Sequence, residues 1–293
     1  MTHNRSEAGK EKNFVAGSSV LAAIFLTGSK LVIGLLTNSL GILSEALHSF
    51  LDLIAAVITM VAVRFSDKPA DDDHNYGHGK IENFSALVET ILLVITCVWI
   101  IYEAVARFLS NQMHIEVTVW SYIVVIGSII IDISRSRALM RVAKKYDSQA
   151  LEADALHFQT DIWSSLVVLI GLIGYDFKYF YADSIAAVFV AFIVLGVSYR
   201  LGKRTFDDLV DKAPRGLTAK IAEALKNVPE VTRFHDIRVR VSGPNKFIEL
   251  NIHVGRMLSI EEAHNISHLA ESAIVSLISN AKVTVHVEPE LGD

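Results

Sequence analysis

The chain is poor in the residues that crosslink or interrupt a soluble fold. It contains one cysteine, Cys97, and five prolines among its 293 residues. A single cysteine excludes an intramolecular disulfide framework and a cysteine-based zinc site, so we expect Cys97 to be a small buried hydrophobe. The first 14 residues are polar and lack the apolar stretch and small-residue cleavage site of a signal peptide. We therefore expect no cleaved signal peptide.

An excess of basic charge and the common hydrolase motifs are also missing. The formal net charge is −5, with 27 Lys and Arg residues against 32 Asp and Glu residues. A chain without a basic excess has no electrostatic footprint for nucleic acid, so we expect no nucleic-acid partner. The sequence contains neither HExxH nor GxSxG. These absences leave the enzyme alternative, a membrane metallohydrolase, without support.

Long apolar runs are what the chain does have. Hydrophobic residues make up 52% of it and charged residues only 20%. Six runs have about the 20 residues that a helix needs to cross the hydrocarbon core of a bilayer. They cover residues 15–36, 40–65, 81–109, 117–140, 149–174 and 182–201. The sequence therefore predicts a polytopic α-helical membrane protein with six transmembrane helices in a lipid bilayer.

Lysine and arginine in the connections predict the orientation of these spans. Basic residues precede the first span, lie in the second connection and follow the sixth span, and those of the fourth connection include Arg135 and Arg137. The first connection has none, and the fifth has only Lys178. Because cytoplasmic loops are enriched in Lys and Arg, we expect both termini in the cytoplasm, with residues 1–14 as a cytoplasmic tail. The expected location is the inner (plasma) membrane of the cell.

The composition changes after Arg204, where a charged linker begins. Two later segments have the spacing of amphipathic helices and three alternate as strands do. The helices are predicted at 216–227 and 259–278, and the strands at 231–241, 247–254 and 282–288. The order αββαβ predicts a small ferredoxin-like α+β domain at 207–293, after a membrane domain at 15–206. A domain this small is near the lower limit for an independent core, so we expect a homodimer.

Histidine and aspartate recur at one spacing in two of the apolar runs. His48 and Asp52 lie four residues apart in the second run, and His157 and Asp161 four apart in the fifth. Residues i and i+4 share one face of a helix, and ionisable side chains in hydrocarbon need a partner. The two pairs together offer four nitrogen and oxygen ligands, the number that tetrahedral Zn²⁺ requires. The alternatives are polar contacts between helices, or a metal that only stabilises their packing.

This set of ligands predicts proton-coupled chemistry. Metal binds neutral imidazole and ionised carboxylate, so metal binding expels protons and protonation expels metal. The unperturbed imidazole pKa of about 6.5 places this exchange near physiological pH. A site with alternating access would therefore exchange a divalent cation for protons. Glu45 and Asp154, three residues before each histidine, are expected at the rim of a polar cavity or between packed helices.

A second cluster lies in the connection between the second and third spans. Asp71, His74 and His78 follow one another closely in a polar segment. Imidazole and carboxylate suit a zinc-like ion, and a solvated polar loop is the alternative.

A third group of histidines lies in the predicted soluble domain. In the last strand, His286 and Glu288 share the polar face because side chains alternate. His235 opens the hairpin, and His264 lies on the last predicted helix. The ordinary interpretation of His253 and His268 is that each is a single surface histidine.

The six spans, the paired HxxxD motifs, the segment DDDHNYGHGKIEN at 71–83 and the histidine-bearing αββαβ domain resemble the cation diffusion facilitator family. The likeness is to its bacterial zinc and ferrous-iron efflux branch. Members are homodimeric antiporters that move Zn²⁺ or similar ions out of the cytoplasm in exchange for protons. The resemblance thus implies export of Zn²⁺, or of Cd²⁺, Co²⁺ or Fe²⁺, by alternating access, with Zn²⁺ also bound as a structural or regulatory ion.

The resemblance also implies roles for individual residues. It implies a transport site at His48, Asp52, His157 and Asp161, a loop site at Asp71, His74 and His78, a cytoplasmic site at His235, His264, His286 and Glu288, and a salt bridge between protomers from Lys80 to Asp211.

Three positions depart from the pattern of that branch. His48 stands where the branch commonly has Asp, which resembles the zinc-selective branches and favours Zn²⁺ over Fe²⁺. Asn251 stands where a histidine is usual; Asn is a poor zinc ligand, and His253 on the same strand face is the residue that can compensate. Glu288 replaces an Asp and lengthens the reach by one methylene. The remaining alternatives are a transporter whose substrate is Fe²⁺ or Mn²⁺, and a membrane-anchored metal sensor.

Overall fold

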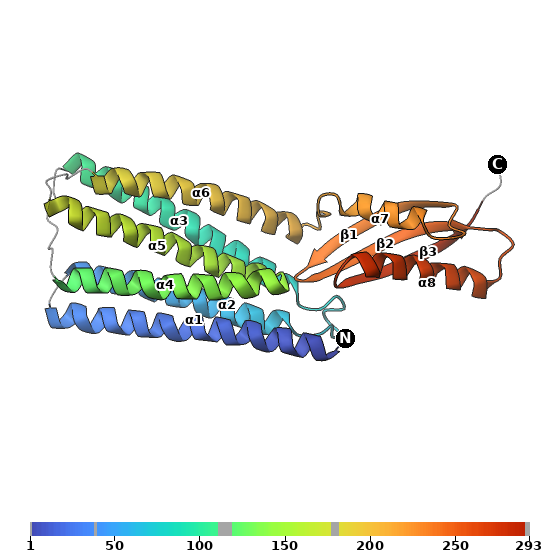
Figure 1. Cartoon of the computed structure of the whole chain (residues 1–293), viewed down its shortest axis with the longest axis horizontal. Coiled ribbons are helices and arrows are strands. Elements are labelled where there is room, and N and C mark those ends of the chain that lie inside the picture. Colours follow the sequence, from blue (N-terminus) through green and yellow to red (C-terminus); the bar gives the residue numbers. More distant parts are fainter. Residues whose placement is uncertain (1, 38–39, 111–118, 177–181, 291–293) are drawn as a thin grey trace.

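The computed structural model describes residues 2–37, 40–110, 119–176 and 182–290. These form an elongated molecule in which a bundle of long helices is followed at one end by a small α+β domain (Figure 1). The start of the chain lies at the end of the bundle nearest the soluble domain. The helices of the bundle are α1 (Thr2–Thr37), α2 (Leu40–Ser66), α3 (Lys80–Ser110), α4 (Val119–Tyr146), α5 (Gln149–Asp176) and α6 (Ala182–Leu209). Each of the six predicted spans is confirmed as a helix.

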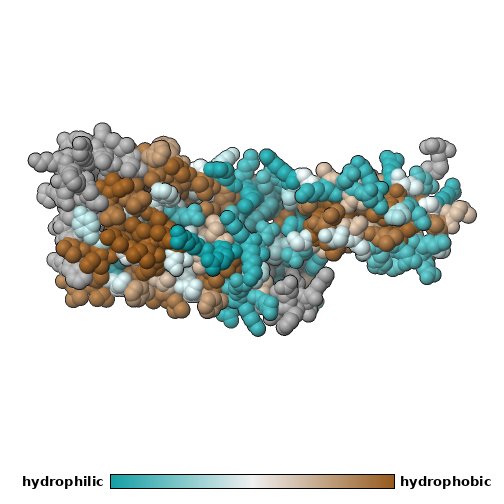
Figure 2. All heavy atoms as spheres, viewed as in Figure 1, coloured by the Kyte–Doolittle hydropathy of each residue, from teal (hydrophilic) through white to brown (hydrophobic). Residues whose placement is uncertain are grey.

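The bundle buries polar side chains and exposes apolar ones. Phe25, Trp99 and Phe192 are more than half exposed, whereas Lys30 and Glu89 are buried. This distribution fits a bundle whose outer surface meets lipid and whose charged groups face one another. Figure 2 shows hydrophobic residues over much of the bundle and a hydrophilic belt where the bundle meets the soluble domain. Among the described residues, α1, α2 and α3 contain stretches apolar enough to cross a membrane by hydropathy alone.

The polar residues at the start of the chain are part of the bundle. Helix α1 begins at Thr2, so the predicted tail at 1–14 is, from Thr2 on, the first part of this helix. Lys12 is only 2% exposed because its ammonium group pairs with Glu82 at 3.0 Å and with Asp67. Glu82 is buried and also accepts a hydrogen bond from Ser66 Oγ. A buried charge needs such partners. The segment that looks like a polar tail in the sequence is therefore packed as part of the bundle.

Helix α4 also differs from the expected span. It continues to Tyr146, beyond the predicted end at residue 140. Arg135, one of the basic residues that the sequence assigns to the following connection, lies within α4 and is buried. Its charge says nothing about membrane orientation, since it pairs inside the bundle.

The soluble domain has the predicted order of elements. They are α7 (Leu217–Lys226), β1 (Arg233–Ser242), β2 (Asn245–Val254), α8 (Ile260–Leu277) and β3 (Ala281–Pro289). The sheet order is β1-β2-β3, with β1 antiparallel and β3 parallel to β2. Ile221 and Leu225 of α7 and Ile274 of α8 pack in one core with Ile248 and Ile252 of β2. The helices therefore cover one face of the sheet, and the opposite face carries the polar residues of the strands.

The β1–β2 hairpin touches the connection between α2 and α3. The backbone N–H of Gly243 donates to Oδ1 of Asn83, in the first turn of α3 just after this connection, at 3.3 Å. The ring of Tyr76 packs edge to face on Phe247 at 5.2 Å between centroids. A Cβ atom on Gly79 would lie 2.5 Å from the carbonyl oxygen of Ser242, so this approach requires glycine. The contact places the α2–α3 connection at the junction of the two parts of the molecule.

Candidate metal sites

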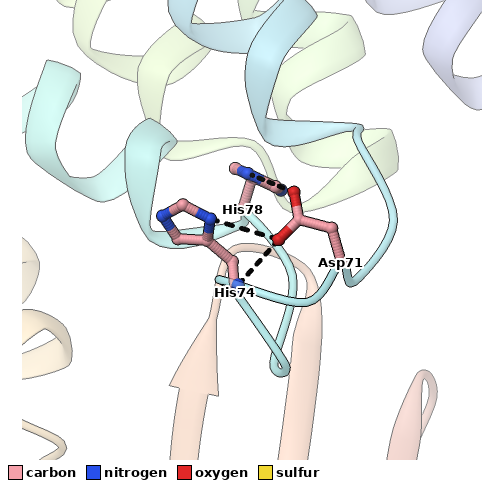
Figure 3. Close-up of side chains that lie close together, drawn as sticks. All are labelled: Asp71, His74 and His78. Atoms are coloured by element: carbon pink, nitrogen blue, oxygen red, sulfur yellow. Dashed lines mark hydrogen bonds and ion pairs between the residues drawn. The ribbon is translucent and has the colours of Figure 1, made fainter.

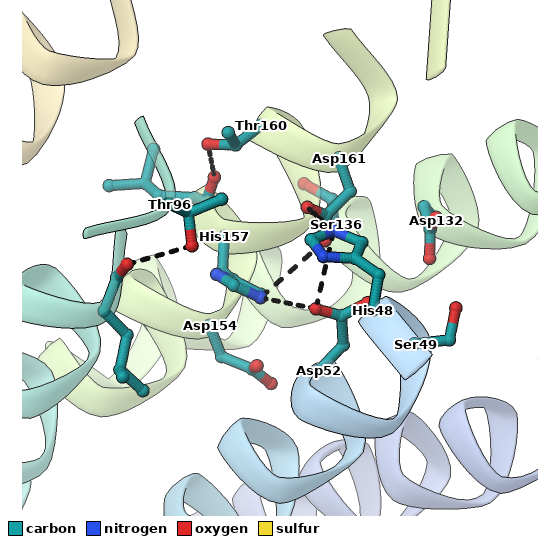
Figure 4. A network of polar contacts seen from close by, with 12 residues as sticks. His48, Ser49, Asp52, Thr96, Asp132, Ser136, Asp154, His157, Thr160 and Asp161 are labelled. Atoms are coloured by element: carbon teal, nitrogen blue, oxygen red, sulfur yellow. Dashed lines mark hydrogen bonds and ion pairs between the residues drawn. The ribbon is translucent and has the colours of Figure 1, made fainter. Parts of the chain in front are cut away.

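The two HxxxD pairs meet in the middle of the bundle. His48 and Asp52 come from α2 and His157 and Asp161 from α5, and their side chains point toward one another (Figure 4). Each pair shares a helix face because its members are four residues apart. Asp52, His157 and Asp161 are between 5% and 8% exposed, whereas the side chain of His48 is 40% exposed. We call these four residues the quartet.

The distances within the quartet suit one small ion. His157 Nε2 lies 3.1 Å from Asp52 Oδ1 and 3.8 Å from Asp161 Oδ2. His48 Nε2 lies 3.6 Å from Asp161 Oδ1 and 3.9 Å from Asp52 Oδ1. Four ligands at about 2.0–2.1 Å from a tetrahedral metal lie about 3.3 Å from one another. Ligand atoms of His48, Asp52 and Asp161 all lie within 4.8 Å of one another, so these three are spaced to hold one dication. His157 contacts both carboxylates but lies outside this group of three.

Two further expectations concern single buried residues of the bundle. Asp154 is 1% exposed and accepts a hydrogen bond from Ser19 Oγ of α1 at 3.4 Å, so it packs between helices. The side chain of Glu45 lies outside the described residues. Cys97 is fully buried among apolar residues, as expected.

Three charged residues beside the quartet were missed as functional candidates. Lys30 of α1 and Asp132 and Arg135 of α4 line a cavity of about 30 Å³ together with His48, Asp52 and Asp161. All three are at most 7% exposed. Their signal in the sequence was a charge inside an apolar run, which marks an intramembrane functional candidate by default.

The three residues of the predicted loop site lie close together. Asp71 Oδ1 lies 3.2 Å from His74 Nδ1, and Asp71 Oδ2 lies 3.4 Å from His78 Nε2 (Figure 3). His78 Nδ1 lies 3.3 Å from the carbonyl oxygen of Pro69, an arrangement that leaves Nε2 for a ligand. The pKa of Asp71 is lowered chiefly because its carboxylate accepts a hydrogen bond from the backbone N–H of His74. The ionised carboxylate and two imidazoles are one set of ligands for a dication.

The cytoplasmic cluster differs in membership from the predicted one. The polar face of the sheet brings His235 Nε2 within 3.0 Å of His253 Nε2 and 3.5 Å of Glu288 Oε2. His253 Nε2 is also 3.5 Å from Glu288 Oε2. Asn251 donates from Nδ2 to Glu288 Oε1 at 2.9 Å, and His286 Nε2 lies 3.7 Å from the same oxygen. The expectation that His253 is an isolated surface histidine is wrong, because it lies directly opposite Glu288 in the sheet.

Within one chain, His264 is not part of this cluster. It is on α8, where its Nε2 is 3.1 Å from Nε2 of His268. His268 in turn contacts Glu271 through Nδ1 at 3.2 Å. His268 is therefore not an isolated histidine either.

A β-bulge helps to place His235. The pairing of β1 with β2 shifts by one residue between His235 and Arg238. Asp236, in the bulge, has a φ of 54°, a left-handed conformation that Asp adopts more readily than most residues. Bulges commonly redirect a side chain next to a functional site.

Lys80 and Asp211 form their salt bridge within one chain. Lys80 Nζ lies 2.8 Å from Asp211 Oδ1 and donates to the carbonyl oxygen of Leu209 at 3.1 Å. The family resemblance described above implies instead a bridge between two protomers. The pair forms inside one chain because α3, which begins at Lys80, lies beside α6, which ends just before Asp211.

The fold defines a polytopic membrane protein, with clusters of possible metal ligands inside the helical bundle and outside it. Residues 18–210 match the model of the cation efflux transmembrane domain, and residues 213–290 match the cytoplasmic domain of cation efflux proteins. The chain therefore belongs to the cation efflux family, whose members are transporters and not enzymes.

Relatives resemble the chain over nearly its whole length. An uncharacterized transporter of Methanocaldococcus jannaschii is 32% identical over 271 residues, covering 92% of this chain and 95% of the relative. The cation-efflux pump FieF of Shewanella oneidensis is 28% identical over 273 residues, covering 93% and 92%. An uncharacterized transporter of Synechocystis is 31% identical over 278 residues, covering 92% and 88%.

Proposed function

We propose that the chain is a divalent metal cation/proton antiporter that exports Zn²⁺ from the cytoplasm by alternating access. The observation that carries this proposal is the quartet, in which two imidazoles and two carboxylates converge in the membrane domain. Membership of the cation efflux family supports export as the direction of transport.

Proton coupling follows from the ligands. A dication binds to the quartet only when both imidazoles are neutral and both carboxylates are ionised. Protons that enter from one side therefore displace the ion, and the ion displaces protons on the other side. Because the unperturbed imidazole titrates at a pKa of about 6.5, modest pH differences across a membrane suffice.

Zn²⁺ is the proposed physiological substrate because the quartet supplies two nitrogen ligands. Imidazole suits Zn²⁺, and oxygen-rich sites suit Mn²⁺. Fe²⁺ or Mn²⁺ remains the alternative substrate. The cation-efflux pump FieF, to which the chain is similar, is named for cation efflux without specifying the ion.

The proposal extends to assembly and orientation. We propose a homodimer in the inner membrane with both termini in the cytoplasm, and with metal at the cytoplasmic cluster drawing two protomers together. The polar face of the three-stranded sheet, which α7 and α8 leave uncovered, and the match to the cytoplasmic domain of the family support this assembly. The start of α1 and the soluble domain lie at one end of the bundle, which supports a common side for the termini.

Transport into proteoliposomes tests the proposal. Purified protein should move Zn²⁺ against its gradient when a pH gradient is imposed, and each direction of the pH gradient should set the direction of Zn²⁺ movement. Asp161→Ala should abolish this movement, because it removes a buried ligand. Asp73→Ala removes an exposed loop carboxylate and should leave it unchanged. Transport that ignores the pH gradient, or that survives in Asp161→Ala, would contradict the proposal.

A further inference from the structure

The quartet is open to a small cavity on the side of helix α4. The cavity has a volume of about 30 Å³, enough for one or two water molecules. Three quartet members form one wall, and the other walls include charged and hydroxyl side chains. The polar residues that line it are Lys30, His48, Ser49, Asp52, Asp132, Arg135, Asp161, Ser164 and Ser165. An ion held by the quartet can therefore keep coordination positions that water fills.

Asp132 supplies a third carboxylate to this cavity. Its residue is 6% exposed, and Figure 4 shows it on α4 beside the quartet. Arg135 Nη1 lies 3.3 Å from Asp132 Oδ1. A buried carboxylate that faces a polar cavity is a strong acceptor for the hydrogen atoms of a metal-bound water.

Arg135 is held in place by contacts on its other sides. Its Nη2 and Nε donate to Ser19 Oγ at 3.1 and 3.3 Å, and its guanidinium carbon lies 3.5 Å from the centroid of the Phe158 ring. Phe158 is fully buried. Because Arg135 is fixed, it positions the Asp132 carboxylate at the cavity wall.

The cavity walls carry charges of both signs. Among the described residues that line the cavity, the cations Lys30 and Arg135 face the carboxylates of Asp52, Asp132 and Asp161. Because Asp132 is held by Arg135 at 3.3 Å, it lies beside the quartet and not within it.

We infer that Asp132 is a specificity-determining residue of the transport site. It accepts a hydrogen bond from water bound to the ion and so stabilises coordination numbers above four. Zn²⁺ is satisfied by the four quartet ligands, whereas Mn²⁺ favours six oxygen-rich positions. Asp132 thus extends the range of ions that the site accepts from Zn²⁺ to Mn²⁺. This inference rests on the proposed transport function.

The ratio of Mn²⁺ to Zn²⁺ transport tests this role. Each ion is supplied alone to proteoliposomes that contain the full chain. Asp132→Asn keeps the size and the acceptor for Arg135 but removes the charge, so the Mn²⁺ to Zn²⁺ ratio should fall about tenfold, as for other partners of metal-bound ligands. Asp132→Glu keeps the charge and should retain a ratio closer to wild type.

Glu89→Gln is the matched control. Glu89 is a buried carboxylate of α3 that accepts a hydrogen bond from Thr59 and does not line the cavity. Its replacement should leave the ratio unchanged. An unchanged ratio in Asp132→Asn, or an equal loss of both ions, would overturn the inference. If wild type moves neither ion, the proposed function itself fails, which is a distinguishable result.

Cobalt spectroscopy provides a second measurement. Co²⁺ is added to the full chain carrying His74→Ala, His235→Ala and His264→Ala, which weaken the exposed clusters, and unbound Co²⁺ is removed. Adding Asp132→Asn should make the bound Co²⁺ absorb more intensely in the visible, because tetrahedral Co²⁺ absorbs more strongly than Co²⁺ that also binds water. Equal absorption with and without Asp132→Asn would overturn the inference.

Discussion

The membrane quartet and the cytoplasmic cluster use the same chemistry in two different settings. In the quartet, Asp52 and His157 are 105 residues apart in the chain and meet between two helices. In the cytoplasmic cluster, His235, His253 and Glu288 lie on three adjacent strands whose hydrogen bonds hold them together. Asp52, His157 and Asp161 of the quartet are at most 8% exposed and only the His48 side chain is accessible, at 40%. In the cytoplasmic cluster the side chains of His235 and Glu288 are about one third exposed and that of His253 is 12% exposed.

The difference in burial decides what each site can do. Charges in a low-dielectric interior are costly without a partner, so a quartet without metal must take up protons or rearrange. Water solvates the cytoplasmic cluster, so that cluster can lose its metal at little cost. We therefore expect ion movement to be coupled to protons at the quartet, while the cytoplasmic cluster responds to the metal concentration.

The largest expected effect is on the rate of Zn²⁺ transport. It distinguishes the two sites when one histidine is replaced in each of them separately. His157→Ala should lower proton-driven Zn²⁺ transport by at least about 100-fold, since a lost ligand costs more than a lost partner of a ligand. His253→Ala should leave the maximal rate within about threefold of wild type and weaken Zn²⁺ binding to the soluble domain. Transport rates in proteoliposomes check both. Equal losses would mean that the sites do not have separate roles.

A smaller effect is expected when the quartet changes its ligand type. His48→Asp replaces nitrogen by oxygen and should shift the preference from Zn²⁺ toward Mn²⁺ and Fe²⁺ by about tenfold, which is 1.4 kcal/mol. Competition among Zn²⁺, Cd²⁺, Co²⁺, Fe²⁺ and Mn²⁺ measures this shift. His286→Asp makes the same replacement in the soluble domain and serves as the control, with transport selectivity expected to stay at the wild-type value.

The cytoplasmic cluster should become a better metal site when Asn251 is replaced. Asn251 now donates to Glu288 Oε1, and a histidine there would add a nitrogen ligand beside His253 and His286. Asn251→His should tighten Zn²⁺ binding by several-fold, up to about tenfold. Calorimetry on the full chain with His74→Ala measures it. Asn251→Gln keeps an amide, and a gain in that variant would contradict the assignment of the effect to the ligand.

The smallest expected effect concerns only the stability of the soluble domain. Ser259 caps α8, and its side chain and that of Glu262 form a reciprocal capping box. Ser259→Ala should lower the free energy of unfolding of this domain by about 1 kcal/mol. Urea unfolding followed by a probe in the soluble domain measures the change. Ser276→Ala, on the same helix but away from the cap, should change it much less.

The same cap carries a pH dependence of definite sign. The pKa of Glu262 is lowered because its carboxylate accepts hydrogen bonds from the backbone N–H and the hydroxyl of Ser259. A lowered folded-state pKa adds stability above the ordinary pKa of Glu, and this stability is lost as pH falls through the lowered value. The difference in stability between wild type and Ser259→Ala should therefore shrink in acid. A difference that grew as pH fell would contradict this.

Periodicity and spacing predicted most of the fold. The six long helices and the αββαβ domain follow from apolar runs and from amphipathic patterns, which depend on neighbouring residues only. The pairs His48 with Asp52 and His157 with Asp161 were also visible, because a helix brings residues four apart to one face. The loop cluster was visible because its members lie within eight residues of one another.

Local sequence pattern predicted the surroundings of a residue wrongly where its side chain contacts a partner far away in the sequence or inside the bundle. Lys12 looked like part of a polar tail but is buried against Glu82, 70 residues away. Arg135 looked like a basic connection residue but pairs with Asp132 inside the bundle. His253 looked like a single surface histidine until the register of three strands placed it against Glu288 and His235.

The amino-acid sequence alone thus determined the class of the protein, the number of spans and the four residues of the quartet. Only the tertiary structure decided which histidines form the cytoplasmic cluster and that a third carboxylate, Asp132, faces the quartet across a water-sized cavity. The physical reason is that spacing along the chain specifies which face of an element a residue occupies. Which faces meet depends on how helices and strands pack, and that packing brings together residues far apart in the sequence.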